Sequence, residues 1–164
     1  MNHLKKLFMS FVYAFRGIFR TIKNERNLRI HLTCLCYMFG FLCLGDWFVL
    51  TKTDWAIILL ASGAVVAGEI VNTAIENAVN LAGEKYTEYG KIAKDAAAGA
   101  VLISAITAVA VGVTILFQPE AFKAMFAYFT AKPIMFILFL LSIIPATLFI
   151  FLGVPFTCGG KNER

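Results

Sequence analysis

The chain has 164 residues, 60% of them hydrophobic, and a formal net charge of +5. Its mean hydropathy is +0.78, and soluble domains are typically only about 45–50% apolar. The composition therefore excludes an ordinary soluble domain and indicates an integral membrane protein. Because the positive charges lie beside apolar segments and no nucleic-acid-binding motif occurs, we expect them to meet a membrane surface, with no nucleic acid as a partner.

An amphipathic surface helix is predicted over residues 4–24. Its apolar residues recur with the 3.6-residue period of a helix from Leu4 to Ile22, and basic residues occupy much of the remaining surface. An aromatic apolar face opposite a basic face is typical of a helix at the membrane interface. A helix packed on its own protein remains the alternative.

Four apolar segments predict transmembrane helices at about 28–45, 55–81, 96–117 and 133–156. The expected fold class is all-α: an N-terminal surface helix, a three-span core and an extra C-terminal fourth span. We assign the core to residues 1–117 and an extension to residues 118–164. A short amphipathic run lies within 118–132, and polar residues fill the connection over 82–95.

The distribution of positive charge predicts the orientation. With four spans, twelve of the 15 Lys and Arg residues lie on one side of the membrane. Lys and Arg concentrate in the cytoplasmic segments of membrane proteins. We therefore expect a multi-pass protein of the cytoplasmic membrane, with both termini and the 82–95 connection in the cytoplasm.

A row of polar side chains in the second predicted span is the strongest candidate site. Its members share one helix face, at spacing i, i+3, i+4 and i+7: Glu69, Asn72, Thr73 and Glu76. A charged side chain at mid-membrane costs roughly 2.5–3.5 kcal/mol on insertion scales, so such a row predicts function. Glu69 lies about 12 residues from the cytoplasmic end of the span, roughly 18 Å deep. This depth favours chemistry between a cytoplasmic compound and a lipid.

Charged residues on the cytoplasmic side could complete this site. Glu25 precedes the first span, and both carboxylates and lysines occur in the 82–95 connection. Carboxylates together with lysines favour Mg²⁺ and phosphate as ligands. The sequence contains neither a P-loop nor the protein-kinase motifs, which excludes those two classes of phosphotransferase.

Three sequence blocks resemble the prokaryotic diacylglycerol kinase family: NERNLRIHL (24–32), EIVNTAIENAVN (69–80) and KIAKDAAAGAVLI (91–103). The family includes small membrane kinases for diacylglycerol and undecaprenol, and the resemblance covers about residues 5–117. It implies a homotrimer of three-span subunits with active sites between protomers. It also implies transfer of the ATP γ-phosphoryl group to a lipid hydroxyl, with Mg²⁺ as cofactor.

The resemblance also implies a role for each candidate residue. Glu69 would be the general base, with Asn72 positioning the reacting groups and Thr73 contacting the lipid. Glu25 and Glu76 would bind the Mg²⁺ carried by ATP. The nucleotide would meet those two carboxylates and a set of residues around the 82–95 connection: Tyr86, Glu88, Gly90, Lys94 and Asp95.

The motifs look closer to the undecaprenol kinase branch, so undecaprenol is the favoured lipid and diacylglycerol the alternative. More remote alternatives are a transporter that uses the buried carboxylates and a non-enzymatic membrane subunit. Asn80 departs from the family pattern, which usually has Asp there; the amide keeps the hydrogen bonding but loses the charge. His31 is expected to hydrogen-bond within its own helix.

Overall fold

The computed structural model of the chain describes residues 3–83 and 87–153, and every regular element in these ranges is an α-helix. The helices are α1 (His3–Asn24), α2 (Arg26–Leu44), α3 (Lys52–Leu81), α4 (Glu88–Leu116), α5 (Pro119–Ala131) and α6 (Pro133–Leu152). Four of them, α2, α3, α4 and α6, are long and apolar enough to cross a membrane. The predicted all-α membrane fold with four spans is therefore confirmed.

The third span differs from its prediction because α4 begins at Glu88, eight residues before the predicted start at 96. The hydroxyl of Thr87 accepts a hydrogen bond from the Gly90 amide at 3.2 Å and caps this earlier end. Hydropathy identifies only the apolar part of a helix. The polar turns at the start of α4 could be predicted only by recognising Thr87 as their N-terminal cap. Residues 154–156 of the predicted fourth span lie outside the described residues.

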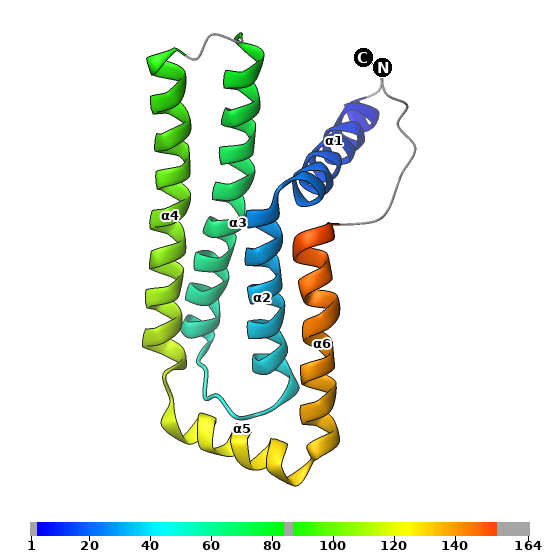
Figure 1. Cartoon of the computed structure of the whole chain (residues 1–164), viewed down its shortest axis with the longest axis vertical. Coiled ribbons are helices and arrows are strands. Elements are labelled where there is room, and N and C mark those ends of the chain that lie inside the picture. Colours follow the sequence, from blue (N-terminus) through cyan, green and yellow to red (C-terminus); the bar gives the residue numbers. More distant parts are fainter. Residues whose placement is uncertain (1–2, 84–86, 154–164) are drawn as a thin grey trace.

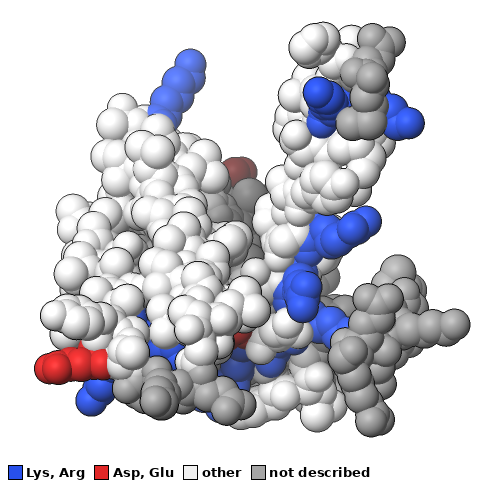
Figure 2. Space-filling model, turned by 90° about the horizontal axis from the view of Figure 1, so that it is seen from above, with Lys and Arg blue, Asp and Glu red and all other residues white. Residues whose placement is uncertain are grey.

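The spanning helices lie side by side, α5 crosses one end, and α1 leaves the bundle towards the other (Figure 1). The C-terminal part of α3 and the N-terminal part of α4 project beyond α2 and α6. Seen from that end, α1 extends as an arm from the body of the molecule, and blue side chains outnumber red ones (Figure 2). Among the described Lys and Arg residues, those at the α5 end are Lys52, Lys123 and Lys132.

A buried arginine joins three helices. Arg29 is only 6% exposed, and its guanidinium donates to the carbonyls of Ile22 at 3.0 Å and Lys23 at 2.8 Å, both in the last turn of α1. It also donates to the Ile150 carbonyl near the end of α6 at 3.1 Å. A cation at helix C-termini satisfies carbonyls that have no partner within the helix. Arg29 therefore fixes the bend between α1 and α2 and fastens α6 to it.

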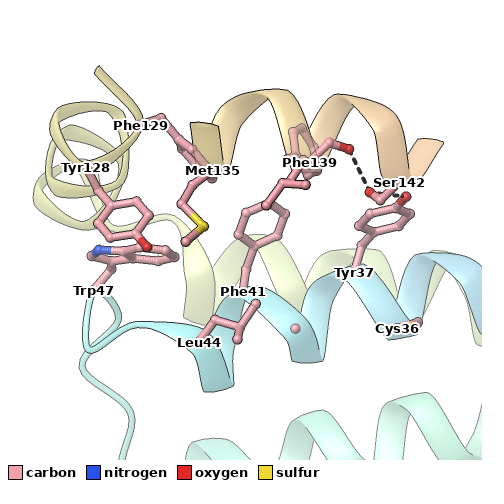
Figure 3. A pocket seen from close by; sticks show the side chains of 12 residues that line it. Cys36, Tyr37, Phe41, Leu44, Trp47, Tyr128, Phe129, Met135, Phe139 and Ser142 are labelled. Carbon is pink, nitrogen blue, oxygen red and sulfur yellow. Dashed lines mark hydrogen bonds between the residues drawn. The ribbon is translucent and has the colours of Figure 1, made fainter. Parts of the chain in front are cut away.

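The extension packs on α2 through aromatic side chains at the α5 end (Figure 3). Phe41 of α2 lies edge-on to Phe139 of α6, with ring centroids 5.4 Å apart, and the Tyr37 and Ser142 hydroxyls are 2.9 Å apart. These residues line an apolar pocket of about 380 Å³. The lining of this pocket contains no residue of α3, so α5 and α6 cover a face of α2 that does not face the polar row.

Candidate functional site

A cleft of about 620 Å³ lies between α1 and α3, and Thr73 of the polar row lines it. Glu69 and Thr73 are buried, whereas Asn72 and Glu76 are half-buried. The cleft is polar on both sides, and its lining includes Arg20, Thr21, Asn24, Glu25, Thr73, Asn77 and Asn80. Thr73 is therefore the member of the predicted row that faces this cleft, whereas Glu69, Asn72 and Glu76 are not among its lining residues.

Glu25 comes to this site from a different segment. It lies between α1 and α2 as the N-terminal cap residue of α2, with an extended backbone. Both Glu25 and Glu76 are close enough to Glu69 for their charges to act on its carboxyl group. The bend that Arg29 holds thus places Glu25 on the cleft that α1 shares with α3.

Asn72 has a buried oxygen without a partner. Its Nδ2 donates to Glu76 Oε1 at 2.9 Å, whereas its Oδ1 accepts no hydrogen bond from the described residues. Leaving a buried acceptor unsatisfied costs about 1–3 kcal/mol. Such an atom fits a site whose missing donor, a hydroxyl or a cation, arrives with the substrate. Thr73, by contrast, donates its hydroxyl to the Glu69 carbonyl at 3.0 Å, within α3.

His31 contacts Glu69, and the prediction that it bonds within its own helix is wrong. The Nε2 atom of His31 on α2 lies 3.2 Å from Glu69 Oε1 on α3. Hydropathy places both residues in apolar segments but gives no relative rotation of the two helices, so the pairing is not visible in either pattern. One feature of the sequence could have suggested the pairing: His31 and Glu69 are titratable residues in two successive spans. Buried charges in membranes are usually paired.

The residues predicted on α4 lie around the end of α3. Lys94 Nζ donates to Asn80 Oδ1 at 2.7 Å. Both residues line a smaller cleft of about 190 Å³ between the two helices, and Asn80 also lines the larger cleft. The two clefts therefore meet at Asn80, one helical turn beyond Glu76.

Gly90 lines the smaller cleft at a position with little room for a side chain. A Cβ atom there would lie 3.0 Å from Val79 Cγ1 and 3.2 Å from Thr87 Oγ1. Glu88 and Asp95 are exposed, and neither is among the residues that line the larger cleft. The remaining candidate, Tyr86, lies outside the described residues.

The carboxyl groups near the polar row are of the kind that Mg²⁺ prefers. Glu25 lines the larger cleft, and Glu76 lies on α3, where its Oε1 accepts a hydrogen bond from Asn72. The described residues contain no cluster of three or more His, Cys, Asp or Glu side chains that could hold a metal by itself. Mg²⁺ usually takes one or two carboxylates together with substrate phosphates and water. The donor set therefore fits an ion that arrives with a nucleotide.

The family model for prokaryotic diacylglycerol kinase matches residues 12–116. Undecaprenol kinase of Bacillus subtilis is 40% identical over 119 residues, which cover 73% of this chain and 94% of that protein. Diacylglycerol kinase of Synechocystis sp. is 40% identical over 114 residues, which cover 69% of this chain and 63% of that protein. No solved structure is significantly similar to the chain. The family match includes all of α2, α3 and α4 and ends before α5.

Proposed function

This chain belongs to the prokaryotic diacylglycerol kinase family and is a membrane lipid kinase, and we propose that it transfers the γ-phosphoryl group of ATP to the hydroxyl of undecaprenol. The similarity to an undecaprenol kinase over 94% of that protein's length carries the choice of lipid. The sequence blocks at 24–32 and 91–103 favour the same branch.

In the proposed mechanism, Glu69 takes the proton of the lipid hydroxyl. The lipid oxygen then bonds to the γ-phosphorus, and the bond from that phosphorus to the leaving oxygen of ADP breaks. Asn72 would position the reacting groups from the next turn of α3, where its Nδ2 donates to Glu76 Oε1. Phosphoryl transfer depends mainly on positioning and charge neutralisation, which a partly buried polar row provides. Thr73, whose hydroxyl donates to the Glu69 carbonyl, is proposed to contact the lipid.

Glu25 and Glu76 would hold the Mg²⁺ that accompanies ATP. The ion would supply charge neutralisation at the phosphates. Lys94 is proposed to bind the phosphates from the α4 side, near the meeting of the two clefts. The remaining nucleotide contacts are proposed for Tyr86, Glu88, Gly90 and Asp95.

Diacylglycerol is the second candidate substrate. The family model and the Synechocystis relative are both named for that activity. Its hydroxyl would use the same base and the same phosphate-binding residues, so the proposed catalytic residues do not distinguish the two lipids. Phosphatidic acid would then be the product.

The decisive experiment offers the purified protein Mg²⁺, γ-labelled ATP and either undecaprenol or diacylglycerol in mixed micelles, with Glu69→Gln as the control. We expect the label to enter undecaprenol faster. Faster labelling of diacylglycerol would transfer the assignment to the second candidate. Transfer to neither lipid by intact protein would overturn both candidates and would mean that Asn80 or the fourth span marks a changed substrate or a lost activity.

The assembly proposed is a homotrimer with active sites between protomers. The exposure of Glu88 and Asp95, away from the carboxyl groups of their own chain, supports a site that a neighbouring copy completes. The proposed orientation places both termini on the cytoplasmic side of the cytoplasmic membrane, in keeping with the charge distribution. Residues 1–117 are proposed as the kinase core and 118–164 as the extension, a division that the end of the family match at 116 supports.

A further inference from the structure

His31 contacts only one of the two carboxyl oxygens of the buried Glu69 side chain, Oε1. His31 Nε2 lies 3.2 Å from Glu69 Oε1, and the two side chains are 28% and 5% exposed. A carboxylate removed from water needs partners to remain ionised. His31 is half-exposed and on a different helix, so the pair links α2 to α3 at the deeper carboxyl group of the polar row.

His31 also marks a boundary between two environments. On one side, Thr73, one turn beyond Glu69 on α3, lines the cleft beside α1. On the other, His31 lines an apolar groove of about 430 Å³ that runs along α2, α3 and α4 and includes Cys34, Ser62 and Val65. Val65 is one turn before Glu69 on α3, so a lipid alcohol lying along this groove would present its hydroxyl beside His31 and Glu69.

We propose that His31 is a positioning residue that holds Glu69 in the orientation needed for proton abstraction. This inference rests on the proposed lipid kinase function. The Nε2–H group of His31 donates to Glu69 Oε1 and leaves Oε2 to take the proton of the lipid hydroxyl. The lipid oxygen then bonds to the γ-phosphorus, and ADP leaves with the electron pair of the broken P–O bond. His31 itself neither gains nor loses a proton in this step.

The test compares side chains that differ in their ability to reach Oε1. Glutamine carries an amide nitrogen at about the place of Nε2, whereas the shorter asparagine cannot reach Glu69 and leucine has no donor. We expect His31→Gln to keep most of the wild-type kcat. His31→Asn and His31→Leu should lower kcat about 10- to 100-fold, because small misplacements of a reacting group cost about that much. The KM for ATP should stay unchanged in all three.

A double variant tests whether His31 acts through Glu69. If it does, adding His31→Asn to Glu69→Gln should lower kcat no further than Glu69→Gln alone. Independent, multiplying losses would overturn the inference. So would a wild-type kcat in His31→Asn, or a His31→Gln variant as slow as His31→Asn.

Controls separate positioning from folding and from the proposed function. Cys43→Ala changes an exposed residue near the other end of α2, outside the lining of the groove, and should leave kcat at the wild-type value. An unchanged KM for ATP and an unchanged unfolding temperature in His31→Asn would show that its loss is not a folding defect. Failure of the wild-type chain to phosphorylate any lipid alcohol would overturn the proposed function, whereas wild-type transfer matched by His31→Asn would overturn only the role of His31.

Discussion

Lys94 Nζ donates a hydrogen bond to Asn80 Oδ1 at 2.7 Å, which ties the start of α4 to the end of α3. Asn80 lines both the larger cleft beside α1 and the smaller cleft between α3 and α4. The proposed phosphate-binding lysine is thus held at the junction of the two clefts by a neutral partner. A carboxylate at position 80 would pair with the ammonium group more strongly.

Replacement of Lys94 by Gln should weaken ATP binding. A hydrogen bond from a charged group contributes about 1.5–3 kcal/mol, so the KM for ATP should rise at least about tenfold, which corresponds to 1.4 kcal/mol. Steady-state kinetics at saturating lipid measures this. Lys91→Gln, a lysine on the same cleft without the bond to Asn80, is the matched control and should change the KM much less.

Restoring a carboxylate with Asn80→Asp should hold Lys94 more tightly. An exposed ion pair contributes about 0–1 kcal/mol, so the KM for ATP should rise by no more than about fivefold. The increase should fade at high ionic strength, because salt screens exposed charges. A KM that falls, or that rises equally at low and high salt, would contradict this account of Lys94.

Glu69→Gln should abolish most turnover while the fold is retained. The amide cannot take the proton of the lipid hydroxyl, and positioned bases typically contribute about 10²–10⁴-fold to the rate. Initial rates of label transfer measure the loss, and thermal unfolding in detergent checks the fold. Wild-type rates in this variant would remove Glu69 from the mechanism.

Glu76→Gln should raise the Mg²⁺ concentration needed for half-maximal activity about tenfold, equivalent to 1.4 kcal/mol. The new amide oxygen can still accept the hydrogen bond from Asn72, so the change mainly removes the charge. Titration of Mg²⁺ at fixed ATP measures the effect. Glu120→Gln is the control, because Glu120 pairs with Lys123 at the opposite end of the molecule and should leave the Mg²⁺ dependence unchanged.

Arg29→Lys should destabilise the protein and slow it. A lysine cannot donate to α1 and α6 together, as the planar guanidinium does. Loss of these part-buried bonds should lower the free energy of unfolding by about 2–4 kcal/mol. Because Arg29 holds the bend where Glu25 lies, kcat should also fall. Unfolding by SDS in mixed micelles and transfer assays measure the two effects.

Ser142→Ala provides the comparison for Arg29→Lys, since it loosens α6 without touching α1. Loss of the contact with Tyr37 should cost about 0.6 kcal/mol, a typical value for an interhelical hydrogen bond in a membrane. The kcat should stay at the wild-type value. A large fall in kcat would show instead that the extension takes part in the reaction.

The sequence by itself determined which segments are helices and which residues form the polar row. Hydropathy and the 3.6-residue period are local properties, so they specify α1, the four spans and the shared face of Glu69, Asn72, Thr73 and Glu76. The three sequence blocks also specify the family, because residue identity at fixed spacing needs no coordinates. Hydropathy and periodicity placed the start of α4 too late, because its first turns are polar and depend on the Thr87 cap.

Only the tertiary structure decided which of these residues meet. The approach of Glu25 to Glu69, the pairing of His31 with Glu69 and the attachment of α6 to α2 through Arg29 all join residues from different helices. Such contacts depend on the rotation and relative height of each helix. Those quantities arise from many small packing interactions distributed over whole helix faces, and no single segment of the sequence contains them.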